Sequence, residues 1–186
     1  MVGTVLVTGA AGFIGSHVVR ELLGQGFAVR ATVRNPTNAE FLKGLPGAEN
    51  LEIVQMDLLE RESVDAAVVG CEDVIHCAAA LYVGAKDAQV EVVDPSIQGT
   101  QNLLDAIDSA GEVSRFIHTS SVAAVRRNGS KNGQTFSNAD WCDDASVESN
   151  AYGFAKAGAE RLAREWVESK SDSDKPRYVS INPSIV

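Results

Sequence analysis

Three closely spaced glycines near the amino terminus limit the fold of this chain more than any other feature. Gly9, Gly12 and Gly15 follow the β-branched run Thr4–Thr8 and open a stretch of helical length, Gly12–Gly24. Glycines at such a junction allow a tight turn, close approach of the backbone to a pyrophosphate, and close packing of the helix on the strand. The helix N-terminus adds free N–H groups and a partial positive charge. The turn is therefore predicted to bind a dinucleotide.

The spacing is Gly-x-x-Gly-x-x-Gly and differs from the general Gly-x-Gly-x-x-Gly fingerprint. The alternative is that the glycines serve only the turn. We expect the cofactor contacts of this segment to come from Thr8, Gly9, Gly12, Phe13, Ile14 and Gly15.

Short β-branched runs alternate with amphipathic stretches along the whole chain, which predicts a parallel sheet with helices on both faces. The expected strands are Thr4–Thr8, Ala28–Val33, Leu51–Gln55, Asp73–His76, Arg115–Thr119 and Arg177–Asn182. The expected helices are Gly12–Gly24, Asn38–Leu45, Arg61–Val69, Pro95–Ala110 and Asn150–Ser169. We predict one α/β domain over residues 1–186, a Rossmann-type doubly wound sheet of six strands.

Local signals refine this pattern. Asp94 is expected to cap a helix that has Pro95 at its first position. The long polar segment Arg126–Glu148 is expected to be a functional or mobile loop, in which Phe136 and Trp141 either line a pocket or anchor the loop.

The charge balance argues against polyanionic partners. The net charge is −9 and the isoelectric point about 4.8, so the long-range field repels nucleic acid and anionic membranes. Three cysteines without Cys-x-x-Cys spacing predict neither a disulfide framework nor a zinc site, and the three histidines show no ligand spacing, so we expect no metal. No signal peptide or membrane-length apolar stretch is evident, and a reducing, cytosolic setting fits best.

Arg34 suggests the type of dinucleotide. An NAD site usually has an acidic residue at the end of the second strand, where this chain has Arg34. The guanidinium fork of an arginine can pair with a 2′-phosphate, which favours NADP; the alternative is a surface arginine. Arg30, four residues earlier on that strand, is expected to add positive potential. Further cofactor contacts are expected where the third and fourth strands end, at Asp57, Leu58, Cys77, Ala78 and Ala79.

A tyrosine and a lysine one helical turn apart, Tyr152 and Lys156, are the candidate proton-transfer pair. A nearby ammonium stabilises phenolate and so favours proton transfer by tyrosine; the alternative is an aromatic packed under a solvated lysine stem. The fifth strand ends in Thr119, Ser120 and Ser121, whose hydroxyls are expected within reach of Tyr152. A serine there can bind a substrate carbonyl or merely cap a helix.

Taken in order, these motifs resemble the extended branch of the short-chain dehydrogenase/reductase superfamily. The resemblance also includes His76-Cys77-Ala78-Ala79 and Asn182-Pro183-Ser184, and the segment Val29–Pro36 is similar to the dihydroflavonol reductase, cinnamoyl-CoA reductase and aldehyde reductase group.

The resemblance implies roles for individual residues. Tyr152 would be the general acid, Lys156 would hold the nicotinamide ribose, and Ser121 would orient the carbonyl. Thr119, Ser120, Pro183 and Ser184 would also border the cofactor. Where the wider superfamily often has an asparagine for a proton relay, this chain has Ser96. Family members also continue into a C-terminal substrate lobe, whereas this sequence stops at Val186.

The resulting hypothesis is an NADPH-dependent oxidoreductase that reduces an aldehyde or ketone, its partner being a small carbonyl substrate. The alternatives are an NAD-dependent nucleotide-sugar epimerase or dehydratase, and a dinucleotide-binding protein without activity. A homodimer is compatible with the sequence.

Overall fold

Six parallel strands form a single sheet in the computed structural model, which describes residues 3–80, 84–131 and 133–186. The sheet has the order β3-β2-β1-β4-β5-β6, so the chain starts near the centre and winds outward in both directions. The predicted Rossmann-type fold is confirmed. The strands are β1 (Thr4–Thr8), β2 (Ala28–Val33), β3 (Leu51–Gln55), β4 (Cys71–His76), β5 (Arg115–Thr119) and β6 (Arg177–Ile181).

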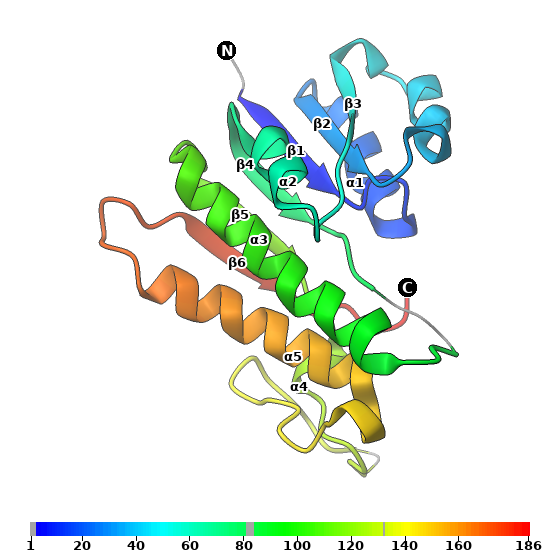
Figure 1. Cartoon of the computed structure of the whole chain (residues 1–186), viewed down its shortest axis with the longest axis vertical. Coiled ribbons are helices and arrows are strands. Elements are labelled where there is room, and N and C mark those ends of the chain that lie inside the picture. The colour runs from blue at the N-terminus through cyan, green and yellow to red at the C-terminus, as the bar shows by residue number, and fades with distance from the viewer. Residues whose placement is uncertain (1–2, 81–83, 132) are drawn as a thin grey trace.

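Helices cover both faces of the sheet (Figure 1). One face carries α2 (Arg61–Val68), α3 (Asp94–Ala110) and α5 (Val147–Glu168), and α3 and α5 pack along each other. The other face carries α1 (Phe13–Gly24) and the 3₁₀ helix η1 (Pro36–Gly44). Shorter elements are η2 (Ala48–Asn50), the π-helical turn η3 (Gln89–Val93) and α4 (Val122–Val125).

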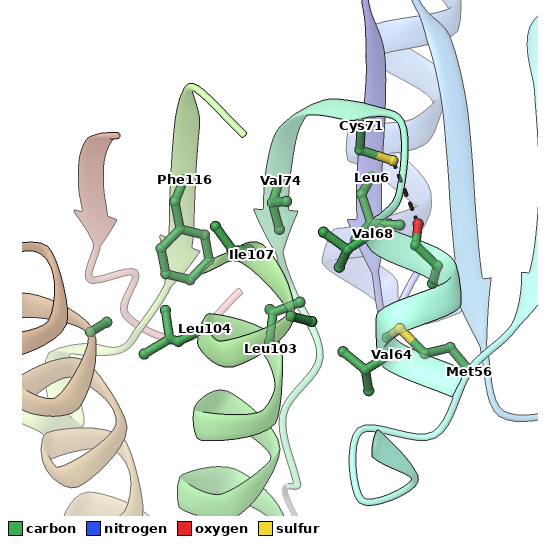
Figure 2. Packing of buried hydrophobic residues seen from close by; sticks show 13 residues of the cluster. Leu6, Met56, Val64, Val68, Cys71, Val74, Leu103, Leu104, Ile107 and Phe116 are labelled. Atoms are coloured by element: carbon green, nitrogen blue, oxygen red, sulfur yellow. Dashed lines mark hydrogen bonds between the residues drawn. The ribbon is translucent and has the colours of Figure 1, made fainter. Parts of the chain in front are cut away.

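The larger core lies between the sheet and α2, α3 and α5. Figure 2 shows Leu6, Val74 and Phe116, from three strands, pointing toward Leu103 and other apolar side chains of the helices. Because the central strand β1 is covered on both sides, Leu6 packs in this core while Val5 and Val7 pack on the opposite face. The second core packs Val19 and Leu23 of α1 and Leu42 of η1 on the opposite face.

Three predicted helices begin at least two residues earlier in the structure; one is α5, which begins at Val147 rather than at Asn150. The segment predicted as Asn38–Leu45 is a 3₁₀ helix from Pro36, because the Asn35 side chain accepts a hydrogen bond from the N–H of Thr37 and caps it. Asp94 is not an N-cap: the carboxylate of Asp87 accepts from the N–H groups of Gln89 and Val90 and starts helical structure there.

Pro95 therefore lies inside a continuous helical segment rather than at its start. It follows the π-helical turn Gln89–Val93, and a proline cannot donate the main-chain bond of a regular helix. The π-helical turn lies just before Pro95, where the regular backbone hydrogen bond is absent. Such turns often occur at functional sites.

The long segment between α4 and α5 is anchored. The indole of Trp141 lies under two cations, with the guanidinium carbons of Arg161 and Arg164 at 4.6 and 4.9 Å from the ring centroid. Cys142 is buried beside Ala124 of α4 and Ala157 of α5. Of the two roles considered for Trp141, the structure shows anchoring.

Among the described residues, the structure contains no helix that is both long and apolar enough to cross a membrane.

Candidate active site

A cavity of about 650 Å³ opens at the carboxyl ends of the central strands. Parallel sheets of this order bind ligands there, where connections leave neighbouring strands toward opposite faces. The predicted residues that line it are Gly9, Gly12, Arg34, Asp57, Leu58, Cys77, Ala78 and Ala79. Residues not predicted from the sequence also line it, namely Ala11, Thr32, Val33, Asn35, Asn38, Met56, Leu59, His76, Ala80, Pro95 and Ser96.

The glycine turn has a geometry that side chains would obstruct. Gly9 has φ +66°, and a Cβ atom there would lie 2.8 Å from the Cα and N atoms of Ala78. A Cβ at Gly15 would lie 2.2 Å from the carbonyl oxygen of Gly9. Gly12 caps α1 without a side-chain hydrogen bond, so the first N–H groups of α1 stay available to an anion.

Thr8 does not line the cavity but holds its floor together. It is fully buried, and its hydroxyl accepts from the N–H of Ala78 at 3.1 Å while contacting Nδ1 of His76 at 2.7 Å. The direction of the bond to His76 depends on the tautomer of the ring. Thr8 therefore links the glycine turn after β1 to the segment after β4.

Arg34 and Arg30 have different surroundings, although the sequence placed both near the cofactor. Arg34 is exposed at the cavity rim, beside Asn35 and Asn38. Arg30 instead donates to Glu52 at 2.7 Å and to the carbonyl oxygens of Ala67 and Val69, among others. The expectation that Arg30 adds positive potential at the cavity was wrong, because its charge is paired away from the rim.

Hydrogen bonds fix Asp57 and Leu58 at the cavity wall. The Asp57 carboxylate accepts from the N–H of Leu59 at 3.0 Å, and the Leu58 carbonyl accepts from the Asn102 amide at 2.7 Å. Leu58 also packs against Gly99 of α3, where a Cβ would lie 2.9 Å from the Cβ of Leu58.

Tyr152 lies at the start of a helix that is capped twice. Ser146 caps the first turn of α5, and the backbone then leaves helical geometry at Asn150. The Asn150 side chain accepts from the N–H of Gly153 at 2.9 Å, which restarts the helix. A Cβ at Gly153 would collide with Asn150, 2.4 Å away, so the glycine after Tyr152 makes room for this cap.

Lys156 is buried, and its ammonium group donates to the main-chain oxygen of Thr119 at 3.0 Å. Burial lowers the pKa of Lys156 to about 8, although the nearby Cys77 and Glu160 act in the opposite direction. The predicted alternative of a solvated lysine stem does not hold. Instead, the lysine ties α5 to the end of β5, two residues before Ser121.

Ser121 caps the short helix α4, and its Oγ accepts from the N–H of Ala123 at 3.1 Å. That contact uses the oxygen as an acceptor, so the hydroxyl hydrogen stays available to another oxygen. Ser120 is also buried, and the Thr119 hydroxyl lies 3.5 Å from the sulfur of Cys77. Burial raises the pKa of that thiol.

Several predicted residues lie outside the lining of the large cavity. Phe13 is exposed on α1, and Gly15 is buried beneath the glycine turn, with Ile14 between them in the chain. Pro183 is half-buried and Ser184 exposed, both after β6. Tyr152 lines a second cavity of about 280 Å³ between the start of α5 and the π-helical turn.

The continuous helical segment from Ala88 to Ser96 borders both cavities. Ala88 and Val92 line the smaller one, while Pro95 and Ser96 line the larger one. The Ser96 hydroxyl donates to the Val92 carbonyl at 2.7 Å and so stabilises this segment. Ser96 stands where the wider superfamily often has an asparagine, and its hydroxyl donates to a carbonyl of its own helical segment.

Comparisons with known proteins agree with this architecture. Residues 5–184 match the model of the NAD dependent epimerase/dehydratase family. A dihydroflavonol 4-reductase from Hordeum vulgare is 38% identical over 192 residues, covering 99% of this chain and 53% of that protein. A cinnamoyl-CoA reductase, CAD2, from Medicago truncatula is 36% identical, covering 98% of this chain and 57% of that protein.

A solved structure is similar as well. The yeast methylglyoxal/isovaleraldehyde reductase Gre2, complexed with NADPH, superposes with a TM-score of 0.88 at 29% identity. The match covers 97% of this chain and 57% of Gre2. The chain therefore spans about half the length of the relatives it matches.

Proposed function

Because this chain belongs to the NAD dependent epimerase/dehydratase family, in its dihydroflavonol reductase and cinnamoyl-CoA reductase group, we propose that it is the cofactor-binding part of an NADPH-dependent carbonyl reductase. One observation carries the proposal: Lys156 donates to the main-chain oxygen of Thr119 at the end of β5, which holds the Tyr152 helix beside the strand that Ser121 follows by two residues. The substrate class is an aldehyde or ketone.

The described residues fit a dinucleotide. The glycine turn leaves the N–H groups of α1 free at the floor of the large cavity, where the backbone is too close for any Cβ at Gly9. In the proposal a pyrophosphate lies against this turn, and Arg34 at the rim pairs with a 2′-phosphate. The protein's net charge of −9 makes such local groups necessary for an anion.

When bound, NADPH supplies a hydride to the carbonyl carbon. Tyr152 donates its phenolic proton to the carbonyl oxygen, and the Ser121 hydroxyl donates a hydrogen bond to the same oxygen. Lys156 uses one N–H on Thr119 and has two left for the nicotinamide ribose. Thr119, Ser120, Pro183 and Ser184 are proposed to border the cofactor near this point.

The general-acid role is tested by Tyr152→Phe in the full-length protein. Turnover, followed at the cofactor absorbance, should fall by at least about a hundredfold, because one general acid typically contributes that much. The dissociation constant for NADPH, from fluorescence titration, should change little. Tyr178→Phe is the matched control, since it removes a phenol hydroxyl that contacts His118 in the core. Normal turnover by Tyr152→Phe would rule out the role.

The cofactor preference is tested by Arg34→Ala. NADPH binding should weaken much more than NADH binding, because only NADPH carries the 2′-phosphate. Arg177→Ala is the control, since Arg177 is exposed at the amino end of β6. An equal loss for both cofactors would remove Arg34 as the selector.

A panel of aldehydes and ketones with NADPH tests the reaction class. The runner-up, a nucleotide-sugar epimerase or dehydratase, is within the description of the matched family. Tightly bound NAD after purification, with no reduction of any carbonyl, would favour that alternative.

A further inference from the structure

A fully buried carboxylate, Glu160, lies one helical turn after Lys156 on α5. A buried charge is tolerated only when donors satisfy it. Burial acts to raise the pKa of Glu160, but the surrounding hydrogen-bond donors outweigh burial and hold it below its usual value. Glu160 is therefore an anion within the protein interior.

The donors come from α5 and from the end of β6. Oε1 accepts from Arg164, with Nε at 3.1 Å and Nη2 at 2.5 Å, and from the Ser180 hydroxyl at 2.9 Å. Oε2 accepts from Nδ2 of Asn182 at 2.8 Å. One carboxylate thus joins α5 to the end of β6.

Asn182 carries the connection on to Ser121. Its Nδ2 donates one hydrogen bond to Glu160. It donates a second to the main-chain oxygen of Ser121, with a distance of 3.0 Å between Nδ2 and that oxygen. The next carbonyl, that of Pro183, accepts from the N–H of Val122 at 3.0 Å. Both polar groups of the peptide unit between Ser121 and Val122 are therefore held by two consecutive residues.

Glu160 also decides which way the Asn182 amide faces. A carboxylate can only accept, so it binds the NH₂ end of the amide. If the amide were reversed, its oxygen would face both the Glu160 carboxylate and the Ser121 carbonyl, which would be repulsive. The direction of the amide is therefore set by the buried charge.

We propose that Glu160 is a positioning residue that, through Asn182, fixes the backbone of Ser121 relative to Tyr152 and Lys156. The inference rests on the proposed function, in which the Ser121 hydroxyl binds the carbonyl oxygen. Ser121 is the N-cap of α4, so the direction of its hydroxyl depends on the backbone around it. A small displacement there misplaces a donor that must meet a reacting oxygen.

The test is Glu160→Gln in the full-length protein. Its NH₂ group must face either the NH₂ of Asn182 or the guanidinium of Arg164, which can only donate, so part of the network breaks. We expect kcat to fall by about tenfold to a hundredfold, with smaller changes in KM and in NADPH affinity. Hydrogen exchange of the peptide over residues 120–126 should become faster.

Two further variants separate positioning from stability. Asn182→Ala breaks only the connection and leaves Glu160 with Arg164 and Ser180, so it should reproduce the loss of kcat even if Glu160→Gln does not fold. Ser180→Ala removes a donor that has no bond to Ser121, so its kcat and local exchange should stay near wild type. The proposal is overturned if Asn182→Ala keeps normal kcat and exchange, or if Ser180→Ala loses as much kcat.

Failure of the proposed function would look different. If no carbonyl is reduced, the reductase assignment fails; if Tyr152→Phe retains turnover, the general-acid role of Tyr152 fails. The exchange measurement needs no turnover: faster exchange in Asn182→Ala would still support the clamp on Ser121, and unchanged exchange would refute it.

Discussion

Acidification from pH 7 to pH 5 should destabilise this fold through two buried histidines. His76 and His118 are neighbours in register on β4 and β5, with ring centroids 5.4 Å apart. Burial and the charge of Lys156 lower the pKa of His118 from 6.5 to about 3. Burial, His118 and Lys156 lower the pKa of His76 well below its usual value.

The sign follows from proton uptake. Below about pH 6.5 the two histidines bind protons in the unfolded chain but stay neutral in the folded chain. The folded state is therefore less stable at lower pH. Over the interval from pH 7 to pH 5, the loss is about 2 kcal/mol for His118. The pKa of His76 is lowered by burial as well, so His76 adds a loss of the same sign.

Urea unfolding followed by circular dichroism at pH 7, 6 and 5 measures this loss. His118→Gln should reduce the difference between pH 7 and pH 5 by about 2 kcal/mol, whatever its effect on stability at pH 7. His17→Gln, at an exposed position on α1, is the matched control and should leave the difference unchanged. A His118→Gln variant with the full wild-type pH dependence would refute the reasoning, because it would mean that His118 is not held neutral by burial.

Other expected outcomes concern the cavity and its loop. Gly9→Ala should abolish NADPH binding and destabilise the fold more than Gly111→Ala does, because both glycines have φ +66° but only Gly9 has backbone where the Cβ would lie. Equal losses of unfolding free energy in the two variants would contradict this, because they would show that the positive φ alone accounts for the cost. NADPH affinity should fall as the pH rises through about 8, where Lys156 loses its proton, and Lys156→Arg should remove that dependence; binding titrations on both sides of pH 8 decide. Trp141→Leu should increase proteolytic cleavage of residues 127–140 several-fold, since each cation–π contact contributes about 0.5–1 kcal/mol. Phe136→Leu is the control within the same loop, and equal cleavage of both variants would contradict the anchoring role.

Local patterns sufficed for the sheet and for the floor of the cavity. The glycine turn, the apolar runs of the strands and the hydroxyl run ending at Ser121 are short-range signals, because turn geometry and strand burial act over a few residues. The doubly wound class of the sheet followed from the alternation of strands and helices together with the glycine turn. The Tyr152 helix was likewise predictable, and Asn150, where its prediction began, is the residue that caps it.

The remaining site features depend on which distant segments meet. Arg30 and Arg34 look alike in sequence, yet only the packing of β2 beside β3 and α2 neutralises Arg30. Asp87 could not be distinguished from Asp94 as a cap, because Val92 and Val93 of the π-helical turn pack against Ala155 of α5, a contact that local sequence does not reveal. Asn38 and Ser96 line the same cavity although they lie on η1 and α3, which are far apart in the chain.

Glu160 illustrates the same limit most clearly. In the sequence it is one of many glutamates, one turn after Lys156, and that spacing was the only signal available. Its burial, and its bonds to Ser180 and Asn182, arise only when β6 adds to the sheet beside β5. The sequence by itself determined the strands, the turn and the types of chemical group. Tertiary structure alone decided which charges are buried and paired, because burial and pairing depend on segments far apart in the chain.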